Sequence, residues 1–241
     1  MTQRVASRRR GFYGIDAPYG PAFMAAVAAF EIFFAVTSGK VWPWFAALFI
    51  LIILGLYLHA TLRGKFVVWA EVIEKLNLRG DERILDMGCG RGAVLLLAAQ
   101  HLTTGRAVGV DLWRSVDQSG NSTDATRRNA ELEGVADRVE LHTADMTVLP
   151  FEDNSFDVVL SSYAIHNVSS NAGRAKAVSE AVRVLRPGGR LLIADVRGTR
   201  LYESHLREIG MNEASRRRIG GSFWRAGASV LTPLVTATKP A

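Results

Sequence analysis

The residues with the clearest chemical potential in this 241-residue sequence form a glycine-rich turn with acidic neighbours. The segment ILDMGCGRGA places Asp86 at the end of an apolar run, just before the alternating glycines Gly88 and Gly90. Glycine permits a tight turn and lets a ligand approach the backbone closely. About 20 residues later, Asp111 ends a second apolar run, where a carboxylate can accept hydrogen bonds from both hydroxyls of a ribose. The sequence therefore predicts a cleft for a nucleoside cofactor where these two runs end.

The elements that would position these residues alternate along the chain from residue 66 onward. Helices are expected over residues 66–76, 93–101, 122–133, 172–185 and 202–209, and strands over residues 82–88, 106–112, 138–144, 156–162, 190–196, 214–225 and 229–238. Apolar strands that alternate with amphipathic helices indicate βαβ units. We therefore expect an α/β fold whose parallel sheet is covered by helices on both faces.

Three later segments help to decide between the two cofactors that such a cleft could hold. The glycine turn and Asp111 alone fit a nicotinamide dinucleotide as well as S-adenosylmethionine. The segments TADM, LPFEDNSFDVVLSS and VLRPGGRLLIADV follow at further strand ends. Together with the glycine turn they resemble the class I S-adenosylmethionine-dependent methyltransferases, over residues 66–241. The resemblance implies a Rossmann-like, seven-stranded, mostly parallel sheet with an antiparallel last strand, and S-adenosylmethionine as the cofactor.

The resemblance also implies which residues hold the methionine part of the cofactor. Asp86 and the backbone of Gly88 and Gly90 contact it, and Ser161, at the end of the fourth strand, faces its amino group. The sulfonium of this cofactor is already activated. Catalysis then depends mainly on placing nucleophile, methyl group and sulfur in line, in a pocket with little water.

A second set of residues is implied for the adenosine part. Asp111 accepts hydrogen bonds from the ribose hydroxyls, and Leu112 packs on the adenine. Asp145 accepts from the adenine amino group, while the backbone of Met146 contacts the ring. A role for Asp145 as a helix-cap or turn residue is the alternative.

Candidate catalytic residues follow the fourth predicted strand in the segment SSYAIHNV. Tyr163, His166 and Asn167 come just past the strand, above the predicted cofactor. The segment is most similar to the ubiquinone/menaquinone C-methyltransferases, which carry an Arg-Asn pair there; His166 replaces the arginine and Asn167 is kept. An imidazole could take or polarise a phenol proton. Ordering of the loop is the alternative role for His166.

The loop after the second strand, WRSVDQSGNS, is polar and contains a glycine. Loops of this kind can cap a cofactor or a substrate. Asp117, Gln118 and Asn121 are therefore candidates for substrate contact. A plain helix-capping connection is the alternative.

Two apolar segments precede the α/β region and predict a membrane hairpin. Residues 41–59 are almost purely apolar and, at about 1.5 Å per residue, long enough to cross about 30 Å of hydrocarbon. Residues 21–37 contain Glu31, which is costly inside a membrane. A shallow helix or a contact with the partner helix accounts for Glu31, and a functional role is the alternative. A cleavable signal peptide is the alternative for the first segment.

Flanking charges orient the predicted hairpin. Arginines crowd the N-terminus, and Arg63 and Lys65 follow the second segment, whereas Lys40 alone lies between the two segments. The positive-inside rule then places both ends in the cytoplasm. The predicted parts are a basic cytoplasmic N-terminus (1–20), a transmembrane hairpin (21–62) and a cytoplasmic methyltransferase domain (63–241). Deletion of the first two parts is expected to leave a folded, soluble domain.

Composition limits the possible partners. A net charge of +6 is compatible with binding to nucleic acid, with binding to anionic lipid, or with a role in solubility alone. The arginines before the first apolar segment favour lipid. The remaining sequence lacks a pattern of basic and base-stacking aromatic residues, so no nucleic-acid partner is expected. The single cysteine, Cys89, excludes an internal disulfide, and no metal site is predicted.

These features together predict a membrane-anchored methyltransferase that acts on a lipophilic small molecule, such as a quinone, a phenol or a lipid. One alternative is a cofactor-binding scaffold that organises a membrane complex. Intact carboxylates at Asp86, Asp111 and Asp145 argue against such a decayed site. A nicotinamide-dependent oxidoreductase is the second alternative.

Overall fold

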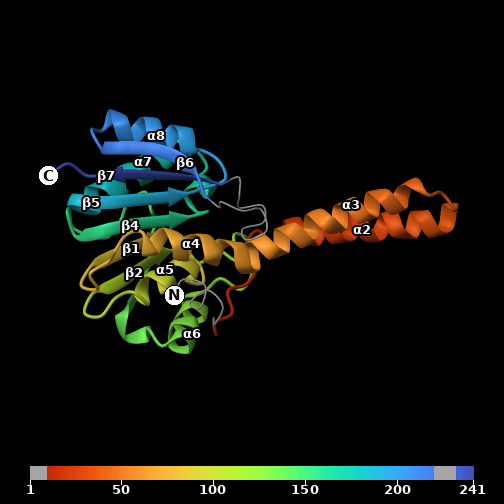
Figure 1. Ribbon diagram of the computed structural model, residues 1–241, viewed down its shortest axis with the longest axis horizontal. Helices are drawn as coiled ribbons and strands as arrows, with labels where there is room; N and C mark the ends of the chain where they lie inside the picture. Colours follow the sequence, from red (N-terminus) through yellow and green to blue (C-terminus); the bar gives the residue numbers. More distant parts are fainter. Residues whose placement is uncertain (1–9, 220–231) are drawn as a thin grey trace.

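The computed structural model describes residues 10–219 and 232–241, and a seven-stranded sheet forms the body of the α/β domain (Figure 1). Its strands are β1 (Arg83–Met87), β2 (Arg106–Asp111), β3 (Val139–Thr143), β4 (Phe156–Ser162), β5 (Leu185–Ala194), β6 (Asn212–Arg218) and β7 (Pro233–Thr238). Their order in the sheet is β3-β2-β1-β4-β5-β7-β6. Strands β1 to β5 are parallel, and β7 is antiparallel to both β5 and β6. The predicted Rossmann-like sheet with an antiparallel last strand is confirmed.

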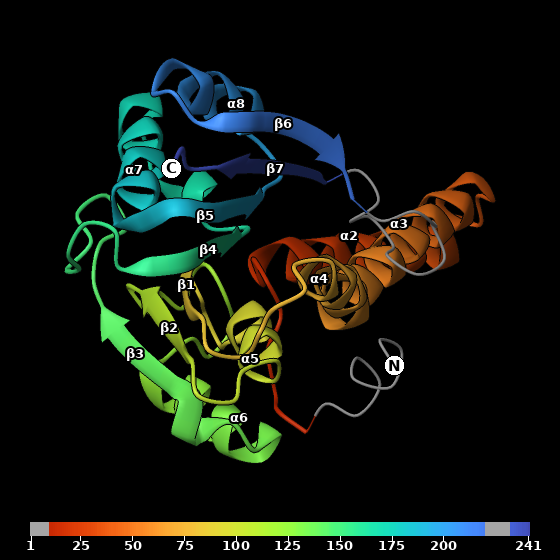
Figure 2. The same ribbon diagram turned by 60° about the vertical axis from the view of Figure 1, so that its left-hand side comes forward.

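Helices cover both faces of the sheet, and Figure 2 shows α4 and α5 on one side and α7 on the other. The helices are α4 (Lys65–Glu74), α5 (Ala93–Ala99), α6 (Thr123–Glu133), α7 (Asn171–Val184) and α8 (Thr199–Glu208). Ile84 of β1 belongs to a buried cluster with Trp69 of α4. The next residue, Leu85, belongs to a second cluster with Tyr202 of α8. Because successive strand residues point to opposite faces, apolar strands build both cores and leave polar residues to the strand ends.

The C-terminal elements differ in extent from the prediction. The strands expected over 214–225 and 229–238 correspond to β6 and β7. Residues 220–231, on which parts of both predictions fall, lie outside the described residues. β5 begins earlier than the predicted residue 190, because Leu185 already pairs with Phe156 before the register shifts at the Pro-Gly-Gly turn.

Two antiparallel helices, α2 (Tyr19–Ser38) and α3 (Trp42–His59), project from the domain as a hairpin (Figure 1). Gly39 ends α2 at a φ of 65°, a left-handed conformation that glycine adopts without strain. The buried positions of the hairpin are alanines and prolines, and most of its large apolar side chains are exposed. By length and composition, α2 and the span Trp42–Glu74 could cross a membrane. Within α2, Oε2 of Glu31 is buried and has no hydrogen-bond partner among the described residues.

The second hairpin helix continues directly into the α/β domain. α3 passes through a π-helical turn, Ala60–Gly64, and then into α4. The boundary predicted between residues 62 and 63 therefore falls inside a continuous helix. Because the helix is continuous through this turn, the packing of α4 against the sheet determines the direction in which the hairpin leaves the domain.

The described part of the N-terminus, residues 10–18, folds back over the domain, and we call it the N-terminal strap. Backbone N–H groups of Gly11 and Phe12 donate to side chains of α6, each at 2.9 Å. The ring of Tyr13 packs edge-on against Phe66 of α4, with centroids 4.9 Å apart. Deletion of the N-terminus and hairpin would therefore remove packing that the sequence did not predict.

Candidate functional site

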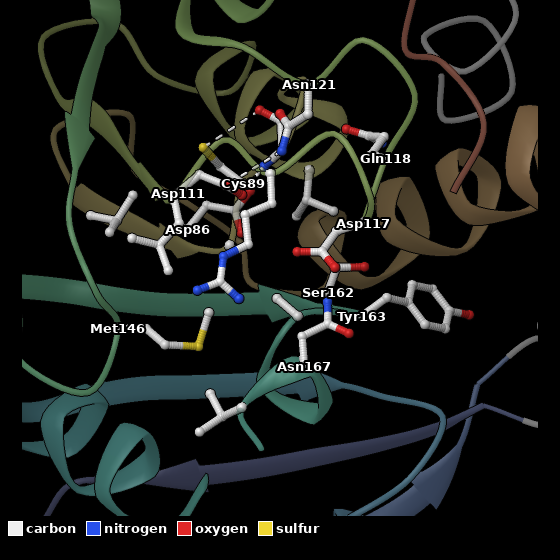
Figure 3. A pocket seen from close by; sticks show the side chains of 18 of the residues that line it. Asp86, Cys89, Asp111, Asp117, Gln118, Asn121, Met146, Ser162, Tyr163 and Asn167 are labelled. Atoms are coloured by element: carbon white, nitrogen blue, oxygen red, sulfur yellow. Dashed lines mark hydrogen bonds between the residues drawn. The ribbon is translucent and has the colours of Figure 1, made fainter. Parts of the chain in front are cut away.

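A cavity of about 290 Å³ opens at the carboxyl ends of β1, β2 and β4 (Figure 3). The strand order reverses at β1, which pairs with β2 on one side and β4 on the other. Open α/β sheets bind ligands at such a reversal point. The sequence-predicted site residues that line it are Asp86, Gly88, Gly90, Asp111, Leu112, Asp145, Met146, Tyr163 and Asn167. Ser161 and His166 lie outside the lining.

The glycine turn gives the cavity room beside the backbone. Gly88 and Gly90 adopt φ values of 75° and 51°, in the left-handed region that other residues rarely occupy. A Cβ on Gly88 would lie 2.1 Å from the Cβ of Ala164, and one on Gly90 would lie 2.6 Å from Oε1 of Gln118. Glycine is therefore required at both positions for steric reasons.

Asp86 provides a buried carboxylate at the end of β1. Its residue is 1% exposed, and Oδ1 has no hydrogen-bond partner among the described residues. Burial raises the pKa of Asp86 to about 7 from 3.8, against a backbone hydrogen bond from Leu95 that lowers it and with a smaller contribution from the negative charge of Asp111. A buried acid with one unpartnered oxygen is stabilised as a carboxylate when a cationic group binds beside it.

Asp111 is held rigidly at the end of β2. Its Oδ2 accepts a hydrogen bond from the backbone N–H of Gly90 at 2.8 Å. Its Oδ1 accepts from the N–H of Trp113 at 2.6 Å and from Nδ2 of Asn121 at 3.2 Å. The carboxylate therefore joins the glycine turn to the loop after β2, and Oδ2 keeps one lone pair for a ligand hydroxyl.

Asp145 lies at the cavity rim in the turn that the sequence analysis gave as its alternative role. Its Oδ1 accepts hydrogen bonds from both the N–H and the hydroxyl of Thr147, each at 2.8 Å. These two bonds lower the pKa of Asp145 below 3.8. The neighbouring Met146 and the 44%-exposed Leu112 add apolar surface to the same part of the cavity. A turn role and a ligand contact are compatible, because Oδ2 is not used in the turn.

Ser161 and Ser162 have opposite orientations at the end of β4. The hydroxyl of Ser161 is buried and donates to the carbonyl oxygen of Met87 at 2.9 Å. The hydroxyl of Ser162 accepts from the indole N–H of Trp69 at 2.8 Å, and Ser162 lines the cavity. Because side chains alternate along a strand, the serine at the cavity is one residue later than predicted.

Only some of the predicted catalytic residues lie at the cavity. Tyr163 and Asn167 line the cavity, and Tyr163 adopts a φ of 54°. Its hydroxyl bonds to Oγ1 of Thr232 at 2.7 Å. Burial raises the pKa of Tyr163 to about 12, which makes this phenol a hydrogen-bonding group rather than a base at neutral pH.

His166 instead faces a buried carboxylate that the sequence analysis overlooked. Its Nδ1 lies 2.6 Å from Oδ1 of Asp195, and its backbone N–H donates to Oδ2 at 3.0 Å. Asp195 is fully buried and also accepts from the hydroxyl of Tyr202 at 3.2 Å. This network orders the turn Ile165–Asn167, which was the alternative role for His166. The signal for Asp195 was its position at the end of the fifth strand, like that of Asp86 at the first.

The last residue of the loop after β2, Ser122, caps α6 and accepts from the N–H of Ala125 at 3.1 Å, as the helix-capping alternative predicted. Gln118 links two segments: its Oε1 accepts from the N–H of Arg91, and its Nε2 donates to Asp16, each at 2.8 Å. Asp117 lines the cavity, and its carboxylate makes no hydrogen bond within the described residues. Burial raises the pKa of Asp117, although the positive charge of Arg114 opposes this shift.

The foot of the hairpin also contributes to the cavity wall. Asp16, in the strap, and Lys65, at the start of α4, line it and form an ion pair at 2.8 Å. Thr61, one turn before Lys65, donates to Oδ2 of Asp16 at 2.8 Å. No sequence pattern indicates this cluster, because the two charged residues lie 49 positions apart.

Comparisons with known proteins identify the domain that carries this cavity. The profile of a family described as "Methyltransferase domain" matches residues 85–193. The ubiquinone/menaquinone biosynthesis C-methyltransferase UbiE of Roseobacter denitrificans is 35% identical over 129 residues, which are 53% of this chain and 48% of that protein. Sterol 4-C-methyltransferase strm-1 of Caenorhabditis elegans is 33% identical over 137 residues, 57% of this chain and 38% of that protein. Residues 85–193 of this chain therefore match a methyltransferase domain.

A solved structure supports the fold of the methyltransferase domain. The crystal structure of a SAM-dependent methyltransferase from Aquifex aeolicus aligns with a TM-score of 0.56 at 18% identity, over 70% of this chain and 88% of that one. The chain spans about half the length of the curated relatives it matches. The match to a methyltransferase domain supports S-adenosylmethionine as the cofactor.

The cavity of the methyltransferase domain fits this cofactor on its own geometry. The cofactor carries an ammonium and a sulfonium, and the buried carboxylate of Asp86, whose Oδ1 has no partner among the described residues, can neutralise a cation. Oδ1 of Asn121 is likewise buried without a partner among the described residues and can accept from a ligand hydroxyl. The glycine turn leaves the space that a bound methionine chain needs beside the backbone.

Proposed function

We propose that this protein is a membrane-anchored methyltransferase that transfers the methyl group of S-adenosylmethionine to a lipophilic small molecule of quinone, phenol or lipid type. One observation carries the proposal: a single cavity joins the two parts of the molecule. Asp86 and Asp111 at the sheet edge line the same cavity as Asp16 and Lys65 at the foot of the hairpin. An acceptor that enters beside the hairpin therefore comes within reach of the cofactor.

In the proposed complex, the sheet edge holds the cofactor, which supplies a methyl group on a positively charged sulfur. Asp86 pairs with the methionine ammonium, next to the backbone of Gly88 and Gly90. The free lone pair on Oδ2 of Asp111 accepts from a ribose hydroxyl, and Asn121 accepts from the other.

The adenine occupies the opposite end of the cavity from the hairpin. Leu112 and Met146 provide apolar contacts for its ring, and Oδ2 of Asp145 accepts from its amino group. This arrangement directs the methyl group toward the hairpin end.

The acceptor occupies the hairpin end in this proposal, on the side where Figure 3 labels Asp117 and Tyr163. Asp117 acts as the general base when the acceptor must lose a phenolic proton, because its carboxylate faces the cavity and has no side-chain partner. Its raised pKa brings proton uptake closer to neutral pH. Asn167 donates to the acceptor oxygen, and His166 positions Asn167 through Asp195 without touching the acceptor.

Two features support a lipophilic acceptor and a cytoplasmic site. One relative is named for ubiquinone and menaquinone biosynthesis and another for sterol methylation. The exposed apolar surface of the hairpin suits hydrocarbon, and its flanking positive charges favour the cytoplasmic side for the domain.

The test is methyl transfer by the full-length protein in detergent micelles. Purified protein is incubated with tritium-labelled S-adenosylmethionine and a total lipid extract of the membranes in which it was expressed. Label is expected to enter the organic phase and to depend on Asp111. Calorimetric binding of S-adenosylhomocysteine without any labelled product would instead support the scaffold alternative.

A further inference from the structure

The loop between β2 and α6 is attached to the foot of the hairpin. The N–H of Ala17 donates to the carbonyl oxygen of Asp117, and the N–H of Ser119 donates to that of Ile15, both at 3.0 Å. The N–H of Ile15 also donates to Oγ of Ser119 at 2.8 Å. α2 begins two residues after Ala17. The loop therefore lies where the hairpin leaves the methyltransferase domain.

The surface formed by this loop and the foot of the hairpin combines apolar and positively charged side chains. Val116 is 53% exposed, and Tyr19, in the first turn of α2, is 70% exposed. Arg114 in the loop and Arg63 beside the hairpin are exposed, and neither forms a salt bridge within residues 10–219 and 232–241. Aromatic residues and unpaired cations are typical of the interface between lipid and water.

Cations at the opposite edge of the sheet are arranged differently. Arg79 pairs with Asp81 at 3.0 Å, and Arg186 pairs with Asp157 at 2.8 Å. Arg79 and Arg186 at the amino edge are thus neutralised by carboxylates, whereas Arg114 and Arg63 on the hairpin side form no salt bridge within the described residues. This asymmetry favours an anionic partner on the hairpin side.

The hairpin also determines which side of the domain faces a membrane. The helix from Trp42 to Glu74 is continuous, and the strap ties the other hairpin end to α6. In Figure 1, β4 and β5 run toward the side from which the hairpin projects. A bilayer crossed by the hairpin would therefore lie opposite the carboxyl edge of the sheet.

We propose that the loop Leu112–Asn121 is a second membrane contact of this protein, distinct from the hairpin. Val116 enters the headgroup layer, and Arg114 and Arg63 bind phosphates of anionic lipids. This inference rests on the proposed anchoring by the hairpin. Arg114 and Asp117 belong to the loop and also line the cavity. The contact therefore places the opening of the cavity at the lipid surface. A lipophilic acceptor then reaches the cavity from the headgroup layer without crossing bulk water.

The experiment uses single-cysteine reporters in the full-length protein. Cys89 is the only cysteine of the chain and is replaced by alanine, after which Val116→Cys is labelled with the environment-sensitive dye NBD. Leu51→Cys, in the middle of α3, reports on the hairpin. Leu132→Cys, at the far end of α6, is the aqueous control with a similar exposure of 49%, against 45% for Leu51. Binding of S-adenosylhomocysteine verifies that each variant is folded.

The proteins are reconstituted in vesicles of phosphatidylcholine with or without phosphatidylglycerol, and spin-labelled lipids are added as quenchers. The inference predicts quenching at residues 51 and 116 but not at 132, with stronger quenching at 116 when phosphatidylglycerol is present. Arg114→Gln and Arg63→Gln are each expected to lower the ratio of membrane-bound to unbound loop about fivefold. Arg127→Gln, on the exposed surface of α6, is the matched control without effect.

The possible outcomes distinguish the membrane contact of the loop from the anchoring by the hairpin. Quenching at residue 51 with none at residue 116 would overturn the loop contact and leave the anchoring intact. Absence of quenching at both residues would overturn the anchoring. Quenching at 116 that ignores lipid charge and both arginine substitutions would refute the role given to the arginines. A reporter at Ser115→Cys repeats the test if Val116→Cys fails to fold.

Discussion

Lys65 Nζ lies 2.8 Å from Oδ2 of Asp16, so the first residue of α4 is ion-paired with the N-terminal strap inside the cavity wall. The side chain of Lys65 is 6% exposed and that of Asp16 is 30% exposed. The pair therefore connects three parts of the molecule: strap, hairpin helix and cavity.

Removal of one partner of this pair is expected to destabilise the protein. Lys65→Met leaves a half-buried carboxylate without its cation, and the free energy of unfolding should fall by about 2 kcal/mol. Thermal unfolding of the full-length protein in detergent measures this loss. Lys75→Met, at the exposed C-cap of the same helix, is the control and should change stability by less than about 0.5 kcal/mol. Equal effects of the two substitutions would show that the pair contributes nothing.

The stability of the cofactor-free protein should fall as pH rises from about 4 to about 7. The pKa of Asp86 is raised from 3.8 to about 7 by burial, so in this window the folded state holds a proton that the unfolded chain has released. Asp86→Asn stays neutral, lacks this pH dependence and should melt at a higher temperature than the wild type at alkaline pH. Identical pH profiles of melting temperature for the two proteins would contradict the raised pKa of this buried carboxyl.

Asp111→Ala should weaken cofactor binding about 10- to 100-fold, because hydrogen bonds to a charged acceptor are typically worth about 1.5–3 kcal/mol. Titration calorimetry with S-adenosylhomocysteine measures this change. Asp124→Ala, on the exposed surface of α6, is the matched control and should bind normally. An unchanged affinity in Asp111→Ala would remove the ribose assignment.

Asp117→Asn should lower methyl transfer about 100-fold or more without changing affinity for S-adenosylhomocysteine. The wild-type rate should rise with pH through the pKa of Asp117, which burial holds above 3.8, because the carboxylate must be deprotonated to act as a base. The variant should lack this acidic limb. Retention of the limb in Asp117→Asn would assign the titration to another group.

His166→Ala should reduce stability as well as turnover, because it removes one partner of the fully buried Asp195. A loss of about 2 kcal/mol in the free energy of unfolding is expected, with nearly normal affinity for S-adenosylhomocysteine. His166→Asn can restore a donor to Asp195 and should recover part of both properties. Failure of His166→Asn to recover turnover while stability returns would favour a direct role of the imidazole in proton transfer.

The sequence was sufficient for the fold class and for most of the cofactor edge. Strand ends in a parallel sheet meet at one edge whatever the details of packing, so Asp86 and Asp111 could be placed together from their positions alone. The pairing of Asp86 with Gly109, two residues before Asp111, agrees with that reasoning. The steric requirement at positions 88 and 90 could also be predicted, because glycine is the residue type that such a tight turn needs.

Tertiary structure decided everything that depends on a side-chain direction or on a distant partner. Whether Ser161 or Ser162 faces the cavity depends on a one-residue alternation that no motif specifies. His166 turns to Asp195, 29 positions away, and Lys65 meets Asp16 across a hairpin of apolar residues. The physical reason is that local sequence determines which backbone conformations are favourable, whereas the partner of a buried charge is determined by which chain segments pack beside it.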